Sequence, residues 1–180
     1  MRRTIVLLGL LATVGVLPIL QYSVLADTPL PPPKITEVWS HNKDYCAVMD
    51  PRQMTTTVYR VEQGDRRTKV WAMFGWFRVA DLSNDGEHLV TGYPGINLLS
   101  LNYTMDDVMI YFFRRGELIQ TVALKELVPE RTALKRTVSH FLWGSYEGLD
   151  SQDRYTVKTV EDRVLTFDIR TGQALAKPVQ

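Results

Sequence analysis

From Ile35 onward the chain alternates short apolar runs with clusters of glycine, aspartate, asparagine and proline. Few segments show helical periodicity, so the pattern predicts an all-β protein with little helix. The continuous apolar run Val108–Phe113 is flanked by charge and is expected to be a central strand buried on both faces. Glu117–Ala123 is its expected hairpin partner. A single helical turn is expected at Leu124–Leu127 because Pro129 would end it.

Three of the expected hairpins align on a turn glycine, at Gly64, Gly116 and Gly172. An aromatic residue lies five positions before each glycine and an apolar residue three before, so the two share one face of a strand. A tryptophan and a polar loop precede each hairpin: Trp39 with loop 40–44, Trp76 with loop 81–87, and Trp143 with loop 145–153. The self-similarity predicts a single β-domain over 35–180, built of about three four-stranded antiparallel units at 35–72, 75–127 and 140–175.

Two stretches resemble a known fold family. Leu82-Ser83-Asn84-Asp85-Gly86 with Leu89-Val90, and Phe167–Gly172, are similar to the inner turn and outer hairpin of β-propeller blades. The resemblance implies blade-like units and carries no function, because propellers serve many uses. Propellers typically close with about four to eight blades. Three units would therefore form a compact blade-like or sandwich-like monomer, or a ring completed by a second chain. The monomer is the first expectation and a homodimer the second.

The first 26 residues have the three parts of a secretory signal peptide. Arg2 and Arg3 precede the apolar run of residues 5–20, and Val24-Leu25-Ala26 matches a cleavage site. Cleavage is expected between Ala26 and Asp27, which predicts a secreted or periplasmic protein whose mature chain does not insert into the membrane. The competing interpretation is an uncleaved transmembrane anchor.

Residues 27–34 are expected to form a proline-rich arm. Pro29, Pro31, Pro32 and Pro33 favour an extended polyproline II backbone. The favoured interpretation is a spacer before the domain, and the alternative is a ligand for a proline-binding module.

Charge and cysteine content exclude several classes of function. The chain has 21 Lys and Arg against 20 Asp and Glu, and cleavage would remove two arginines and no acid, which gives a mature net charge of −1. Such a balance argues against a nucleic-acid partner. The single cysteine, Cys46, lies in an apolar run and is expected to be a buried hydrophobic residue. An intermolecular disulfide or a reactive thiol is the alternative. No metal-site spacing is present, and no cofactor is expected.

The sequence contains no convincing catalytic set. The Gly-x-Ser-x-Gly spacing is not met at residues 144–148, and Ser139 with His140 is expected to point to opposite sides of a strand. His41 with Asp44 and His88 with Asp85 could form a metal or proton-transfer site, but solvated turn residues are the favoured interpretation.

The preferred function is an exported non-enzymatic binding or scaffold protein for an unknown protein or small molecule. Loop 92–104 sits on the β-framework, and its Tyr93 and Ile96 are the candidate binding residues. The tryptophans are expected mainly in the core. The alternative function is a small secreted hydrolase that uses loop carboxylates and a histidine. A third is a subunit of an envelope assembly.

Overall fold

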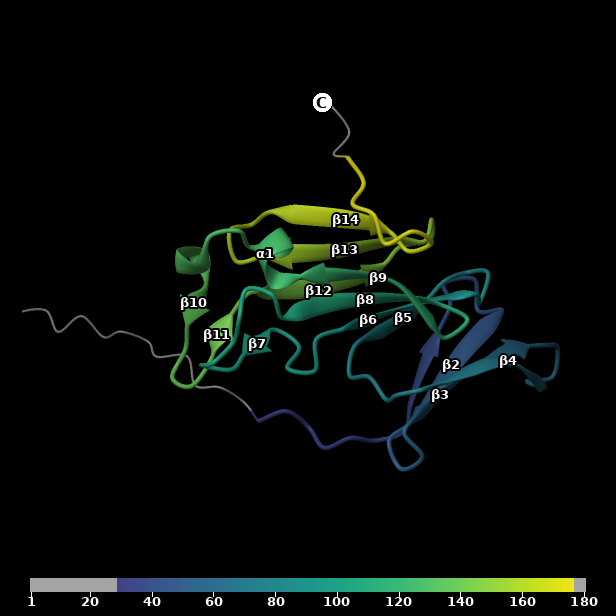
Figure 1. Ribbon diagram of the computed structural model, residues 1–180. Coiled ribbons are helices and arrows are strands. Elements are labelled where there is room, and N and C mark those ends of the chain that lie inside the picture. Colours follow the sequence, from purple (N-terminus) through teal and green to yellow (C-terminus); the bar gives the residue numbers. More distant parts are fainter. Residues whose placement is uncertain (1–28, 177–180) are drawn as a thin grey trace, which may run out of the picture.

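The computed structural model describes residues 29–176, and it confirms an all-β fold with antiparallel sheets (Figure 1). The expected signal peptide and residues 27–28 of the arm lie outside the described residues. Within the described residues, helix is confined to one expected turn, α1 (Leu124–Leu127), and to the 3-10 turn Arg131–Ala133. No helix within residues 29–176 has the length and apolar character needed to cross a bilayer.

The first sheet is a four-stranded meander at one end of the molecule, drawn in blue in Figure 1. Its strands follow in chain order: β1 (Thr36–Trp39), β2 (Tyr45–Asp50), β3 (Thr55–Val61) and β4 (Arg67–Phe74). Threonine and valine dominate β3, as expected of residues with β-branched side chains. Gly64, with a φ of +78°, lies in the turn between β3 and β4.

The second sheet has the order β5-β6-β8-β9 and lies between the first and the third (Figure 1). Its strands are β5 (Ala80–Leu82), β6 (His88–Gly92), β8 (Val108–Arg114) and β9 (Glu117–Ala123). The prediction that β8 is central and buried on both faces is confirmed. Phe112 packs into one core cluster and Phe113 into another, because neighbouring side chains point to opposite faces.

The third sheet, drawn in yellow-green, contains β12 (Gly144–Leu149), β13 (Arg154–Thr159) and β14 (Val164–Asp168). Beyond them Ala174 forms a single bridge with Phe167. The expectation of a loop at 145–153 was wrong for its first five residues, which belong to β12. The segment is a strand because Tyr146 packs inward opposite Val157. It was not predicted because a β-bulge at Tyr146/Gly148 interrupts the alternation of side chains that is typical of a strand.

A small fourth sheet was not predicted. It consists of β10 (Lys135–Arg136), β11 (Phe141–Leu142) and β7 (Leu98–Leu99), in that order. The expected loop 92–104 thus contains a strand, and residues 141–142 pair here rather than in the third sheet. Two-residue strands are too short for alternation to reveal them.

The three larger sheets are stacked by contacts between neighbours and do not close a ring. Gly116, in the turn of the second sheet, packs on Met73 of the first, and Gly172 packs on Gln120 and Phe112 of the second. The larger core cluster lies mainly between the second and third sheets and includes Trp143 and Tyr155. The smaller lies between the first and second.

Candidate functional site

A cleft of about 460 Å³ lies between two edge strands, β5 of the second sheet and β12 of the third. The walls come from the connection before β5, from loop 92–104 and from β12. The lining residues are Arg78, Val79, Ala80, Asp81, Ile96, Asn97, Ser145, Tyr146, Glu147 and Gly148. The cleft therefore combines side chains of both charges with the ring of Tyr146 and the aliphatic surface of Ile96, and its volume is in the range of small-molecule sites.

Asp81 is the most perturbed charged residue of the cleft. It lies in the middle of β5, between Ala80 and Leu82, and is only partly exposed. Burial raises the pKa of its carboxyl to about 6, although a hydrogen bond from the backbone of Leu149 partly opposes the shift. A carboxyl with this pKa is largely ionised at neutral pH but is incompletely solvated, so a donor or a cation brought beside it would be favoured.

Two tyrosines lie near Asp81: Tyr146 is partly buried and lines the cleft, and Tyr155 is fully buried and is not among the lining residues. The hydroxyl of Tyr146 donates to the carbonyl of Met109 at 2.7 Å and accepts from the backbone N–H of Tyr93 at 2.8 Å. Burial, assisted by the charge of Asp81, raises the pKa of Tyr155 far above its usual value. Within residues 29–176, the Tyr155 hydroxyl is buried and has no hydrogen-bond partner. The Tyr146 side chain is thus held in place by two hydrogen bonds, whereas the Tyr155 hydroxyl makes none within the described residues.

The structure places the two expected binding residues differently. Ile96 lines the cleft and has a φ of +60°, and its carbonyl accepts a 2.8 Å hydrogen bond from the indole of Trp143. Tyr93 is partly buried and is not among the lining residues, but its backbone is bonded to Tyr146. Asp81 and Arg78 were not predicted as site residues from the sequence. The available signal was an isolated acid between apolar residues in Val79-Ala80-Asp81-Leu82.

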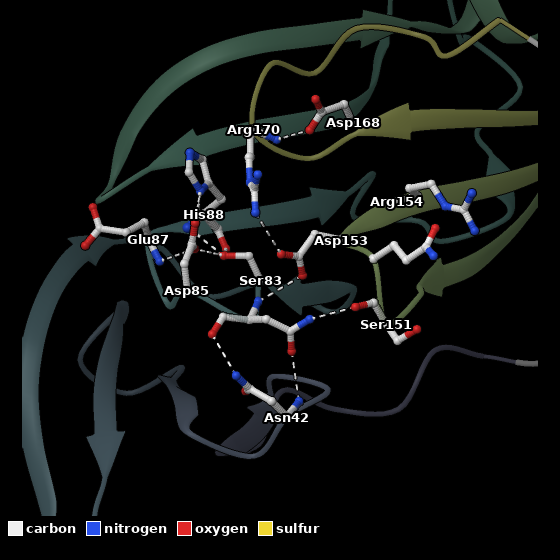
Figure 2. Close-up of polar contacts among 12 residues, drawn as sticks. Asn42, Ser83, Asp85, Glu87, His88, Ser151, Asp153, Arg154, Asp168 and Arg170 are labelled. Carbon is white, nitrogen blue, oxygen red and sulfur yellow. Dashed lines mark hydrogen bonds and ion pairs between the residues drawn. The ribbon is translucent and has the colours of Figure 1, made fainter.

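A second polar region links the inner turns of the three sheets at one end (Figure 2). The N–H of Asn42 donates to Asn84 Oδ1 at 2.8 Å, and the Asn84 side chain donates to the carbonyl of Ser151 at 3.1 Å. The backbone N–H of Asn84 donates to Asp153 at 2.9 Å, and Arg170 approaches the same carboxylate at 3.7 Å. Asn84 is therefore the central link between the first and third sheets.

The second turn is fixed by its own side chains. Ser83 Oγ donates to Asp85 at 2.5 Å, and the N–H of Glu87 donates to the same oxygen at 2.8 Å. Burial would raise the pKa of Asp85, but these hydrogen bonds and the neighbouring His88 outweigh it and hold the pKa below its usual value. His88 is largely buried, with Nδ1 3.3 Å from Asp85 Oδ2. The contacts of Asp85 and His88 stabilise the turn, and neither residue lines the cleft.

The other candidate chemical groups lie apart from the cleft. His41 is exposed in the first turn, and residues 29–176 contain no group of three or more His, Cys, Asp or Glu side chains that could hold a metal ion. The expectation that Ser139 and His140 point apart was wrong. They lie in the turn between β10 and β11, where Ser139 Oγ is 2.9 Å from His140 Nδ1 in an exposed contact.

The tryptophans divide into two pairs. Trp71 and Trp143 are buried in the core, whereas Trp39 and Trp76 are partly exposed and each lies beneath an arginine guanidinium. The expectation of core packing is thus confirmed for two of the four.

No protein-family model and no curated protein matches the sequence.

Proposed function

We propose that the chain is an exported, non-enzymatic binding protein whose cleft between β5 and β12 takes a small organic cation. One observation carries the proposal: the partly buried carboxyl of Asp81, with its pKa raised to about 6, lies in a cleft of about 460 Å³. Perturbed carboxyl groups in clefts mark functional sites more often than surface acids do.

The chemistry of the cleft favours an amine or amidine that carries an apolar group. A ligand cation beside Asp81 would stabilise the ionised carboxylate, which burial alone disfavours. Ile96 and the ring of Tyr146 offer an apolar surface for the remainder of the ligand. Glu147 adds a second acid at the mouth, and Arg78 could pair with an anionic substituent.

Benzylamine is a suitable probe because it joins an ammonium group to one ring, and phenylacetate is the matched control with the opposite charge. We expect benzylamine to shift backbone NMR signals of β5 and β12, with much weaker effects from phenylacetate. Binding should be tighter at pH 7.5 than at pH 5, because the cation binds the ionised form of Asp81. Asp81→Asn should weaken benzylamine binding at least tenfold at pH 7.5. Equal affinity of wild type and Asp81→Asn would refute the role of Asp81.

Loop 92–104 supports the apolar side of the proposed site. Ile96→Ala should weaken benzylamine binding several-fold, because it removes part of the apolar wall. Tyr93→Ala should act less strongly, since the link to Tyr146 uses the Tyr93 backbone. Unchanged affinity in both variants would count against a binding role for this loop.

Export is proposed from the signal-like pattern of residues 1–26. The measurement is the N-terminal sequence of the protein recovered from a secreting host, which should begin at Asp27. A retained Met1 with membrane association would instead support the uncleaved anchor.

We propose that the protein is a monomer, because the face of the third sheet that points away from the second is mostly polar. Ser145, Thr156, Lys158 and Thr166 occupy this face, as their register with the inward-facing Tyr146, Val157 and Phe167 requires. Val164, which pairs with Lys158 and is 45% exposed, adds an apolar side chain to it. Completing a ring with a second copy would bury these polar groups. Light scattering of the mature protein should give the monomer mass, and a stable dimer would contradict the proposal.

A further inference from the structure

The proline-rich arm is held against the body of the protein by two side chains. It runs along the lower side of the sheets in Figure 1, in purple, before it enters β1. The indole Nε1 of Trp76 donates to the carbonyl of Lys34 at 2.9 Å, and Nη1 of Arg78 donates to the carbonyl of Pro31 at 2.5 Å. Both donors come from the connection between β4 and β5, more than forty residues later in the chain. The arm is therefore a bound segment over these residues.

The spacing of the two accepted carbonyls fits a polyproline II helix. Pro31 and Lys34 are three residues apart, which is one turn of that helix, so their carbonyl groups point to the same side. A polyproline II backbone makes no internal hydrogen bonds, and proline has no N–H, so these carbonyls are available to outside donors. Two donors at this spacing recognise the backbone form of the segment.

The two donors are also arranged on one side of their own segment. Trp76 and Arg78 are two residues apart, and the guanidinium of Arg78 lies over the Trp76 ring at 5.1 Å from its centroid. Phe77, between them, is directed to the core, where its ring lies 6.0 Å from that of Phe113. The cation-π contact keeps both donors together, and the contact of the partly buried Phe77 with Phe113 holds the segment that carries them.

We propose that Trp76 and Arg78 form a recognition surface for polyproline II segments, with residues 29–34 as its resident ligand, which a proline-rich segment of another chain can replace. Docking of a preformed polyproline II segment on aromatic side chains is the usual mode of such recognition, and Trp76 supplies an aromatic side chain here. The surface shares Arg78 with the lining of the proposed amine site, and the two are told apart by their other residues, because Trp76 belongs to this surface alone and Asp81 to the cleft.

Competition with the arm determines how the surface can be detected. A segment tethered in the same chain acts at an effective concentration in the millimolar range, so a free peptide must exceed that concentration or meet a weakened arm. Replacing Pro31, Pro32 and Pro33 by glycine keeps the carbonyls but removes the backbone preference. The triple variant should therefore leave the surface largely free.

The first measurement is the NMR signal of the Trp76 indole N–H in the full chain, assigned with Trp76→Phe. We expect the triple glycine variant to move this signal toward the position of a solvated indole. Pro29→Gly, which lies outside the Pro31–Lys34 pair, is the matched control and should leave it in place. The buried Trp143 indole reports on folding and should not move in either variant. An unchanged Trp76 signal in a folded triple variant would overturn the proposal.

The second measurement adds a synthetic peptide, Pro-Leu-Pro-Pro-Pro-Lys-Ile, to the triple variant at up to about 10 mM, above the effective concentration of a tethered arm. The peptide should return the Trp76 signal to its wild-type position, and a peptide with glycine in place of the prolines should not. Adding Arg78→Met to the triple variant should weaken peptide binding at least fivefold. No response to the proline peptide, or an equal response to the glycine peptide, would refute binding of another chain. Neither result depends on benzylamine binding.

Discussion

The ring of Tyr45, at the start of β2, lies directly against Gly86 in the turn between β5 and β6. A Cβ atom added to Gly86 would overlap this ring, and the φ of Gly86 is +68°. In addition, the Gly86 carbonyl accepts a 2.7 Å hydrogen bond from the indole of Trp71. The turn of the second sheet is thus packed against two aromatic residues of the first.

Gly86→Ala should therefore destabilise the protein more than a glycine replacement in an open turn. The left-handed backbone costs a non-glycine residue about 1–2 kcal/mol, and the overlap with Tyr45 adds to that cost. Gly64→Ala is the matched control, because Gly64 also has a positive φ but has nothing within 4 Å of an added Cβ. Urea unfolding should show a loss of about 1–2 kcal/mol for Gly64→Ala and a larger loss for Gly86→Ala. Equal losses would contradict this packing role.

The same turn shows what the sequence could predict. The Asn-Asp-Gly cluster was interpreted as turn geometry, and the positive φ of Gly86 and the Ser83–Asp85 hydrogen bond agree with that local interpretation. The contact with Tyr45 depends on how two sheets stack, and no local pattern records it. β8 was predictable because it is apolar on both faces, whereas β12 was not, because it is polar on one face and bulged.

The pH dependence of stability should reveal Asp81. Its folded pKa of about 6 exceeds the ordinary value of 3.8, so the folded state binds more protons and stability falls as the pH rises from about 4 to 6. The shift corresponds to about 3 kcal/mol. Asp81→Asn should therefore be more stable than wild type at pH 7.5, by up to about 3 kcal/mol, with the difference shrinking toward pH 4.

Asp85→Asn is the control with the opposite sign. The pKa of Asp85 is lowered on folding, so its ionised form stabilises the protein above the unfolded pKa, and that contribution is lost as the pH falls. Asp85→Asn should be less stable than wild type at pH 7.5, and the two should converge in acid. The free energies of unfolding of wild type and Asp81→Asn should be compared at pH 4 and pH 7.5. If their difference is the same at both, Asp81 titrates normally.

The cleft was only partly predictable from the sequence, because it depends on how the second and third sheets stack. Ile96 was identified because it lies in a loop with apolar residues on a β-framework. Asp81 and Glu147 lie on strands of different sheets, and the stacking of β5 beside β12 brings them to one cleft. An isolated acid in a short strand has no spacing that indicates a partner.

Asn84→Ala should weaken the link between the inner turns. The substitution removes the acceptor for Asn42 and the donor to Ser151, so we expect a loss of about 1–3 kcal/mol in the free energy of unfolding. Asn102→Ala is the control, because within residues 29–176 the Asn102 side chain accepts a local hydrogen bond from Ser100 and makes no link between sheets. Urea unfolding of both variants gives the comparison. Equal stabilities would show that solvent replaces the Asn84 contacts at no cost.

Cys46 should be unreactive in the folded protein. It is fully buried, and burial together with the charge of Glu37 raises the pKa of its thiol to about 11. Since the thiolate is the reactive form, a pKa raised by about two units lowers its population at pH 8 by about 100-fold, and burial slows access further. Reaction with Ellman's reagent should therefore be at least about 100-fold slower in the native protein than in urea.

Glu37→Gln tests whether the charge of Glu37 contributes to the raised pKa of the Cys46 thiol. It removes the smaller of the two causes named above, the charge of Glu37, while burial of the thiol remains, and it also breaks the 2.7 Å ion pair between Glu37 and Arg67. The native reaction should become faster, while the reaction in urea should match wild type. A fast native reaction of the wild-type protein, or a disulfide-linked dimer on a non-reducing gel, would instead support the interpretation of Cys46 as an accessible thiol that bridges two chains.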